Sequence, residues 1–304
     1  MPKDFISVLD FKDRLQEILR IGGEIKKKFK NGEPYHPLAG KSLGMIFEKP
    51  STRTRISFEV GTTQLGGHAL YLSPKDLQLG RGETIADTAK VLSRYVDGIM
   101  YRAFEHDMML ELAENATVPV ISGLDDVEHP CQIMADLMTI REHKEDFDKK
   151  FVYVGDGNNV CHSLLLGSAI VGMDMIACTP EGYEPDPEFV EKAKKIAEGT
   201  GSSIEISNDP MKSVKDTDVI YTDVWVSMGD EDEKKKRMKD FEGFQVNTSL
   251  VEKAKDDVIV MHCLPAHRGV EITDDVLDGE HSVVFDQAEN RLHAQKAIMA
   301  ELMG

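Results

Sequence analysis

The chain has 304 residues, of which 41% are hydrophobic and 30% charged, so we expect two folded domains of about 150 residues rather than a disordered protein. Its 36 basic and 54 acidic residues give a net charge of −18, which argues against nucleic acid and anionic membranes as partners. A small anionic substrate would therefore need a local basic site.

The location of the protein is predicted from its cysteines and its first residues. Cys131, Cys161, Cys178 and Cys263 are far apart and show no paired spacing. The first residues lack an apolar signal core, and no uninterrupted apolar run approaches about 18 residues. We expect a cytoplasmic protein with reduced thiols.

The first half of the chain predicts a leading helix and then alternating strands and helices. Apolar spacing predicts a helix over 5–30 that is interrupted at Gly22-Gly23. Amphipathic stretches such as 84–95 separate the strands, and a long helix over 129–144 leads into a charged connector, 144–150. The strands are expected at 42–47, 68–72, 98–102 and 118–122.

The alternation resumes after the connector, and 288–303 forms a last helix that could pack on either domain. Repeated strand–helix units predict parallel sheets covered on both faces, joined by right-handed crossovers. The fold class is therefore α/β with two doubly wound parallel-sheet domains, divided at 147/148. We expect the charged run 230–240 to be a solvated helix or loop. The strands of this half are expected at 151–154, 174–178, 203–206, 218–222 and 258–263.

The segment Ser51-Thr52-Arg53-Thr54-Arg55 follows the first strand and opens a helix whose expected apolar face includes Ile56, Phe58, Val60 and Leu65. The unpaired N–H groups of a first helical turn attract anions. Three hydroxyls and two guanidinium groups add donors that suit phosphate oxygens. This run therefore predicts a phosphate site.

Polar residues recur where predicted strands end: Arg102, 155–159, Asp223 and Cys263. Ligands of open α/β sheets bind beyond the carboxyl ends of the strands, so these residues are candidates for one site in each domain. His129 and Gln132 lie three apart on one helix face and could donate to one carbonyl oxygen. Asp223 and Ser227 could hold an ammonium group, and Arg291 could bring a further guanidinium.

Two other kinds of site are less well supported. Gly155-x-Gly157 suggests a dinucleotide, but Val160 replaces the third glycine and Thr179 stands where an acid would bind ribose. His262, Cys263 and His267 suggest zinc, but their spacing does not suit a closed tetrahedral site. We expect no cofactor and no metal; Asn158 and Asn159 could instead bind a carboxylate.

Four motifs together resemble the ornithine carbamoyltransferases, of the superfamily shared with aspartate carbamoyltransferase. They are Ser-Thr-Arg-Thr-Arg at 51–55, His-Pro-Cys-Gln at 129–132, Asp-Val-Trp-Val-Ser-Met-Gly at 223–229 and His-Cys-Leu-Pro at 262–265. The resemblance spans essentially the whole chain. It implies direct transfer of a carbamoyl group from carbamoyl phosphate to the δ-amine of L-ornithine, with no covalent intermediate, in a cytoplasmic homotrimer with shared active sites that could assemble further.

The resemblance also implies a role for individual residues. It makes 1–147, with the returning helix 288–304, the carbamoyl phosphate-binding domain and 148–287 the ornithine-binding domain. Cys263 and Leu264 would lie near the ornithine side chain and also border the carbamoyl phosphate site, and the catalytic residues would be Arg102, His129, Asp223 and Cys263. Carbamoyl phosphate would be bound by Ser51, Thr52, Arg53, Thr54, Arg102, His129, Gln132, Arg291 and Gln78 of a neighbouring subunit, and ornithine by Asn159, Asp223, Ser227 and Met228.

Three alternatives remain open at this stage. Arg81-Gly82-Glu83 resembles a basic loop of the aspartate enzyme, but Asp223 makes the amine pocket acidic. Putrescine lacks the α-carboxylate that Asn159 would bind, and a non-catalytic homologue could keep the fold. Arginine biosynthesis is the expected role, although the sequence does not distinguish it from the reverse, catabolic direction.

Overall fold

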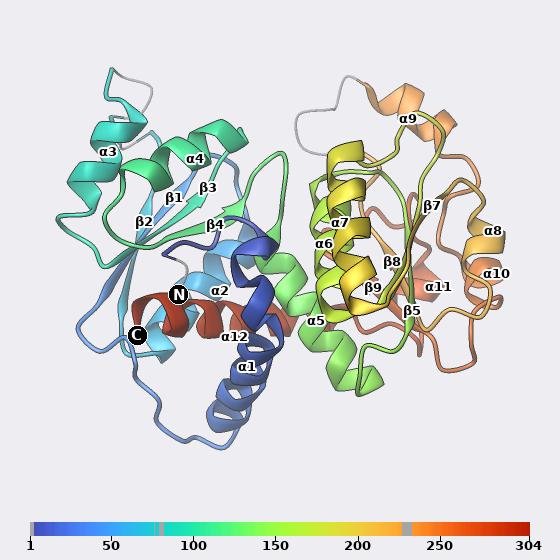
Figure 1. Cartoon of the computed structure of the whole chain (residues 1–304), viewed down its shortest axis with the longest axis horizontal. Coiled ribbons are helices and arrows are strands. Elements are labelled where there is room, and N and C mark those ends of the chain that lie inside the picture. Colours follow the sequence, from blue (N-terminus) through green and yellow to red (C-terminus); the bar gives the residue numbers. More distant parts are fainter. Residues whose placement is uncertain (1–2, 76, 79–81, 227–232) are drawn as a thin grey trace. The chain divides into compact units, whose positions relative to one another are not determined.

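A computed structural model of the chain describes residues 3–75, 77–78, 82–226 and 233–304 (Figure 1). The chain divides into two compact units, Met1–Met138 with Glu289–Gly304, and Thr139–Ala288. Each unit is built on a parallel sheet flanked by helices, so the expected pair of α/β domains is confirmed. None of the helices in these ranges is both long and apolar enough to cross a membrane.

Unit 1 contains a four-stranded parallel sheet in the order β2-β1-β3-β4. The chain enters at β1, moves outward to β2 and returns past β1 to β3, which puts a topological switch point between β1 and β3. The terminal residues Glu289–Gly304 belong to this unit, so the last helix returns to it as expected. The elements are η1 Val8–Arg14, α1 Leu15–Lys30, β1 Ser42–Phe47, α2 Thr52–Gln64, β2 His68–Leu72, α3 Ile85–Leu92, β3 Gly98–Arg102, α4 His106–Asn115 and β4 Val120–Leu124. Two helices cross the boundary between the units: α5 Pro130–Lys144 belongs to unit 1 up to Met138, and α12 Val284–Met303 belongs to it from Glu289 onward.

The two faces of the unit 1 sheet are covered by different helices (Figure 1). Ile99 and Tyr101 of β3 join the apolar core formed with α3 and α4. Because side chains alternate along a strand, Arg102 lies on the opposite face, where α2 and α12 pack. A Cβ on Gly61 of α2 would lie 3.1 Å from Cε of Met299, so glycine at this position lets α12 approach α2 closely.

Unit 2 contains a five-stranded parallel sheet in the order β7-β6-β5-β8-β9, with its switch point between β5 and β8. Its core joins Val152, Ile220 and Val260 of the sheet to Phe241 and Leu250 beyond it. The elements are β5 Lys150–Val154, α6 Asn159–Val171, β6 Asp174–Cys178, α7 Pro187–Thr200, β7 Ile204–Ser207, α8 Pro210–Ser213, β8 Val219–Thr222, α9 Lys234–Asp240, α10 Thr248–Val251, β9 Ile259–His262 and α11 Asp274–Leu277.

Three sequence expectations are wrong. The first helix continues through Gly22-Gly23, where a Cβ on Gly22 would lie 2.7 Å from Sδ of Met138, so the glycine serves close packing. The predicted apolar face of α2 is only half correct, since Ile56 and Val60 are exposed. The fourth strand lies at Val120–Leu124, two residues later than expected, because Val120 rather than Val118 pairs with β3.

Candidate active site

The helix α2 begins at the switch point of unit 1, directly after β1. Ser51 is its N-cap, and the Ser51 hydroxyl accepts a hydrogen bond from the backbone N–H of Thr54 at 3.2 Å. The first turn contains no acidic residue that would compete with an anion. The N-terminus of α2 therefore has the electrostatics of an anion site.

Two arginines from different elements converge on the buried Thr54 hydroxyl. Arg102 at the end of β3 donates to Thr54 Oγ1 at 3.5 Å, and Arg291 of α12 donates to the same atom at 3.1 Å. Arg102 also donates to the backbone carbonyl of Gly123 at 3.4 Å. Since Arg102 is 5% exposed and Arg291 2% exposed, this end of the sheet concentrates positive charge in a molecule of net charge −18.

Arg291 is oriented by a buried hydrogen-bonded chain. Its guanidinium donates to Gln132 Oε1 at 2.6 Å, and Gln132 Nε2 donates to Asp136 Oδ1 at 2.8 Å. The amide of Gln132 thus links the guanidinium to a buried carboxylate. This arrangement fixes Arg291, a positioning function that sequence spacing did not predict for Gln132.

His129 precedes α5 and is buried among these arginines. Burial lowers the pKa of His129 well below its usual value, and the positive charges of Arg291, Arg102 and Arg53 lower it further. The imidazole is therefore neutral at physiological pH. A neutral imidazole can donate one hydrogen bond to a carbonyl without adding charge.

The remaining residues expected at the phosphate site are less buried than Thr54 and its two arginines. Arg53 is half-buried, whereas Thr52 and Gln78 are exposed. Arg55 turns away from the site, because its guanidinium stacks 3.8 Å from the ring centre of Tyr71 and pairs with Glu59 at 3.5 Å. Only one of the two guanidinium groups of the 51–55 motif thus remains a candidate for phosphate.

In unit 2, polar side chains from three strand ends meet at the switch point. Asn158 after β5 caps α6 and donates to Asp223 Oδ2 at 3.1 Å. Cys263 after β9 donates to Asp223 Oδ1 at 2.8 Å. Both carboxylate oxygens of the buried Asp223 are therefore oriented by neighbours. Asn159 is the first residue of α6, beside this cluster in sequence.

His262, Cys263 and Asp223 offer ligand atoms within 4.8 Å of one another. However, His262 Nδ1 accepts from the backbone N–H of Leu264 at 2.8 Å, and Nε2 lies 3.1 Å from Glu271 Oε1. Since both ring nitrogens are engaged, His262 acts here as a support for the loop at Leu264. A zinc ion would have to displace one of these bonds.

The glycine-rich turn after β5 has a packing explanation. A Cβ on Gly157 would lie 2.2 Å from the backbone nitrogen of Pro185, so only glycine fits. Asp156 between the two glycines pairs with Arg237 at 2.8 Å. The prediction of a solvated run at 230–240 is therefore wrong for Arg237, whose side chain is 12% exposed and also donates to the Trp225 carbonyl at 3.0 Å.

Sequence reasoning missed this ion pair because its partners are 81 positions apart. An acidic residue within a buried turn needs a cationic partner. Asp156 in the turn between β5 and α6 was therefore the one sign in the sequence that a distant basic residue packs there. Two further expected ligands, Ser227 and Met228, lie outside the residues that the structure describes, as does Arg81 of the alternative basic loop.

Comparisons with known proteins also divide the chain into two parts, but the second match includes residues 289–302, which belong to unit 1 of the structure. Residues 3–142 match the family model "Aspartate/ornithine carbamoyltransferase, carbamoyl-P binding domain", and residues 147–302 match the Asp/Orn binding domain of the same family. The chain is 58% identical to an ornithine carbamoyltransferase of Methanosarcina mazei over all of both chains. It is 55% identical to a catabolic ornithine carbamoyltransferase of Thermoplasma volcanium, over 99% of this chain and 98% of that protein.

Solved structures give the same result. The ornithine carbamoyltransferase of Pyrococcus furiosus superposes with a TM-score of 0.97 at 56% identity, over 100% of this chain and 97% of that one. The chain thus matches both family domains, and each of its units has a parallel sheet with polar residues at the switch point. The chain belongs to the aspartate/ornithine carbamoyltransferase family.

Proposed function

We propose that the protein transfers the carbamoyl group of carbamoyl phosphate to the δ-amine of L-ornithine, giving L-citrulline and phosphate. The observation that carries this proposal is the convergence of Arg102 and Arg291 on Thr54 at the N-terminus of α2. The amine attacks the carbamoyl carbon directly, with no covalent enzyme intermediate. The names of the relatives at 55–58% identity support the same reaction.

Carbamoyl phosphate would bind unit 1 through its phosphate. Ser51, Thr52, Arg53 and the backbone N–H groups of α2 would hold the phosphate oxygens, and Gln78 would reach in from a neighbouring subunit. Thr54 accepts from two guanidinium groups, so its own hydrogen is directed to a third acceptor, an oxygen of the substrate. Phosphate would then leave as an anion that the site already stabilises.

The carbonyl of the carbamoyl group would face Arg102, His129 and Thr54. Negative charge grows on this oxygen during attack, and one preorganised donor is commonly worth about 3 kcal/mol in the transition state. A neutral His129 contributes a hydrogen bond without repelling the neighbouring arginines. Gln132 would support this step by fixing Arg291.

Ornithine would bind unit 2 with its amine beside Asp223 and Cys263 and its carboxylate near Asn159. Ser227, Met228 and Leu264 would complete this pocket. An alkylammonium has a pKa of about 10.4 in water and must lose a proton before attack. Exclusion of water favours the neutral amine, and Asp223 with Cys263 would accept or relay the proton.

The choice of amine is tested by an assay of the carbamoylated products of ornithine, aspartate and putrescine under matched conditions. We expect citrulline as the main product, because an acidic Asp223 disfavours the side-chain carboxylate of aspartate and Asn159 would have no partner on putrescine. A faster reaction with aspartate or putrescine would overturn the choice of ornithine. No product from any of the three would favour a non-catalytic homologue.

We further propose a cytoplasmic homotrimer with shared active sites. Ile56 and Val60 on α2 and Leu70 and Tyr71 on β2 are exposed apolar residues on elements that pack together, which suits a subunit contact. Cysteines that are all thiols suit a reducing compartment. Sedimentation should give three times the 33.9 kDa chain mass, or a multiple of that mass where trimers assemble further, and a monomer would contradict the shared site.

The proposed role is arginine biosynthesis, because transfer from an activated acyl phosphate to an amine favours citrulline. A catabolic role would run this reaction backwards, and one of the relatives is named as catabolic. Deleting the gene in its host should create a requirement for citrulline or arginine. Growth without either supplement would argue for the catabolic role.

A further inference from the structure

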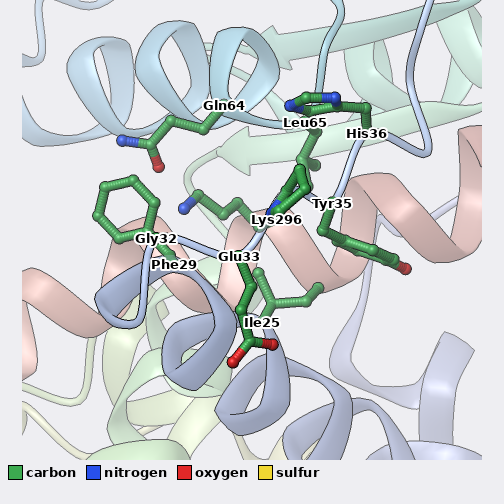
Figure 2. A pocket seen from close by; sticks show the side chains of 10 residues that line it. Ile25, Phe29, Gly32, Glu33, Tyr35, His36, Gln64, Leu65 and Lys296 are labelled. Carbon is green, nitrogen blue, oxygen red and sulfur yellow. The ribbon is translucent and has the colours of Figure 1, made fainter.

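A second pocket lies within unit 1, away from the strand ends. It is bordered by the end of α1, the segment 32–36 after it, the end of α2 and the middle of α12 (Figure 2). Its volume is about 330 Å³, at the lower end of the range for small-molecule sites. Ile25, Phe29 and Leu65 supply apolar walls, so a ligand with an apolar body would fit.

A buried cation projects into this pocket. Lys296 of α12 is 1% exposed, and its Nζ lies 4.0 Å from the ring centre of Phe29. Among the residues that the structure describes, no carboxylate pairs with this ammonium. Figure 2 shows it beside the Phe29 ring, on the side where the Gln64 amide also points. Buried charges normally have a partner, so the position favours an anion.

A buried acceptor lies in the same pocket. Oε1 of Gln64, the last residue of α2, is buried and accepts no hydrogen bond from the described part of the chain. A buried amide oxygen without a donor is uncommon in folded proteins. The pocket thus presents one cation and one acceptor against apolar walls.

The neighbouring charged groups are engaged elsewhere. On α1, Lys26 donates to Asn290 and Lys30 pairs with Glu289 of α12. Glu33 at the exposed end accepts from Asn31 at 3.0 Å. The buried end of the pocket is therefore cationic, with Lys296 as its charge.

We propose that this pocket binds a small amphipathic carboxylate. The carboxylate would pair with Lys296, the apolar body would lie against Phe29, Ile25 and Leu65, and a hydroxyl or amino substituent would donate to Gln64 Oε1. This site does not depend on the proposed carbamoyl transfer. Its ligand class is a monoanion with an apolar part, whereas the site at α2 suits a phosphate.

The experiment is a ¹⁹F NMR titration of the full-length protein with 4-fluorobenzoate, in saturating inorganic phosphate to occupy the arginine site. We expect saturable binding that Lys296→Met weakens by about tenfold or more, as for loss of a charged hydrogen bond. Lys27→Met is the matched control, because Lys27 is an exposed lysine of α1 outside the pocket, and it should leave the affinity unchanged. The neutral probe 4-fluorobenzamide should bind much more weakly than the carboxylate.

The pH profile of the unmodified protein is a second readout that needs no variant. Burial lowers the pKa of Lys296 to about 8, so 4-fluorobenzoate affinity should fall about tenfold between about pH 7 and pH 9. The nearby His293, whose pKa burial and Lys296 lower to about 4, stays neutral throughout. Absence of saturable binding, equal binding by Lys296→Met, or a flat pH profile would overturn the proposal.

Discussion

Arg291 donates a hydrogen bond to the hydroxyl of Thr54 at 3.1 Å, although the two residues are 237 positions apart in the chain. The contact exists because the terminal helix returns to unit 1 and packs on α2, where Gly61 leaves room for it. The return of the last helix therefore completes the arginine cluster at the start of α2.

We expect Arg291→Ala to weaken carbamoyl phosphate binding by about thirtyfold, corresponding to about 2 kcal/mol for a lost charged hydrogen bond. The control is Arg55→Ala, which removes an arginine of α2 that stacks on Tyr71 instead of reaching Thr54. It should change the affinity by no more than about twofold. Equal losses in the two variants, measured by calorimetry, would show that general positive charge suffices.

The cysteine at the end of β9 is predicted to act on the ornithine side. Cys263→Ser retains a donor for Asp223 but shortens its reach, so the KM for ornithine should rise while the affinity for carbamoyl phosphate stays the same. Steady-state kinetics with each substrate varied in turn distinguishes the two effects. If the variant loses only its affinity for carbamoyl phosphate, Cys263 serves the carbamoyl phosphate site and not the ornithine pocket.

His129 should make folding sensitive to acid. Its pKa in the folded protein lies well below the unfolded value of about 6.5, so below that pH the unfolded chain binds a proton that the folded chain excludes. At neutral pH His129 is uncharged in both states, so it does not affect the free energy of unfolding. As the pH falls below about 6.5, protonation of His129 in the unfolded chain lowers this free energy by at most about 1.4 kcal/mol per pH unit.

Chemical denaturation of His129→Gln between about pH 5 and pH 7 measures this effect. The variant should lose less stability on acidification than the parent protein does. His36→Gln, at an exposed histidine, is the control and should keep the parent profile. A parallel loss in all three proteins would mean that His129 is not the group responsible.

The buried pair of Asp156 and Arg237 should stabilise unit 2. Arg237→Ala removes the guanidinium that pairs with the buried Asp156 carboxylate, at a cost of about 3 kcal/mol in the free energy of unfolding. Arg268 also pairs with two carboxylates, Asp274 and Asp278, but is exposed, so Arg268→Ala should leave the denaturation midpoint almost unchanged. Similar midpoints for both variants would contradict a structural role for the buried pair.

The sequence predicts the strands best, because a strand buried on both faces reads as a short apolar run between polar turns. The run 42–47 became β1 with the expected bounds, and Arg102 and Asp223 do lie at the ends of strands. Because ligands of such sheets bind beyond the carboxyl ends of the strands, the sequence alone also predicted that Asp223 and Cys263 lie close together.

The predictions that proved wrong concern residues whose contacts lie far away in the sequence. Gly22 looked like a helix break because local propensity cannot register Met138 packed against it. Arg237 looked solvated because its partner Asp156 is far away in the chain. Arg55 looked like a phosphate ligand because the ring of Tyr71, which draws it away, belongs to the next strand.

We propose above that the start of α2 captures a phosphate-bearing substrate through Thr54 and its two arginines. Calorimetric titration of carbamoyl phosphate into the parent protein and Thr54→Val tests it most directly, since valine keeps the shape and removes the shared hydroxyl. We predict saturable binding by the parent and about tenfold weaker binding by the variant. No saturable heat with the parent, or equal affinity in both proteins, would show that carbamoyl phosphate is not bound through the Thr54 hydroxyl.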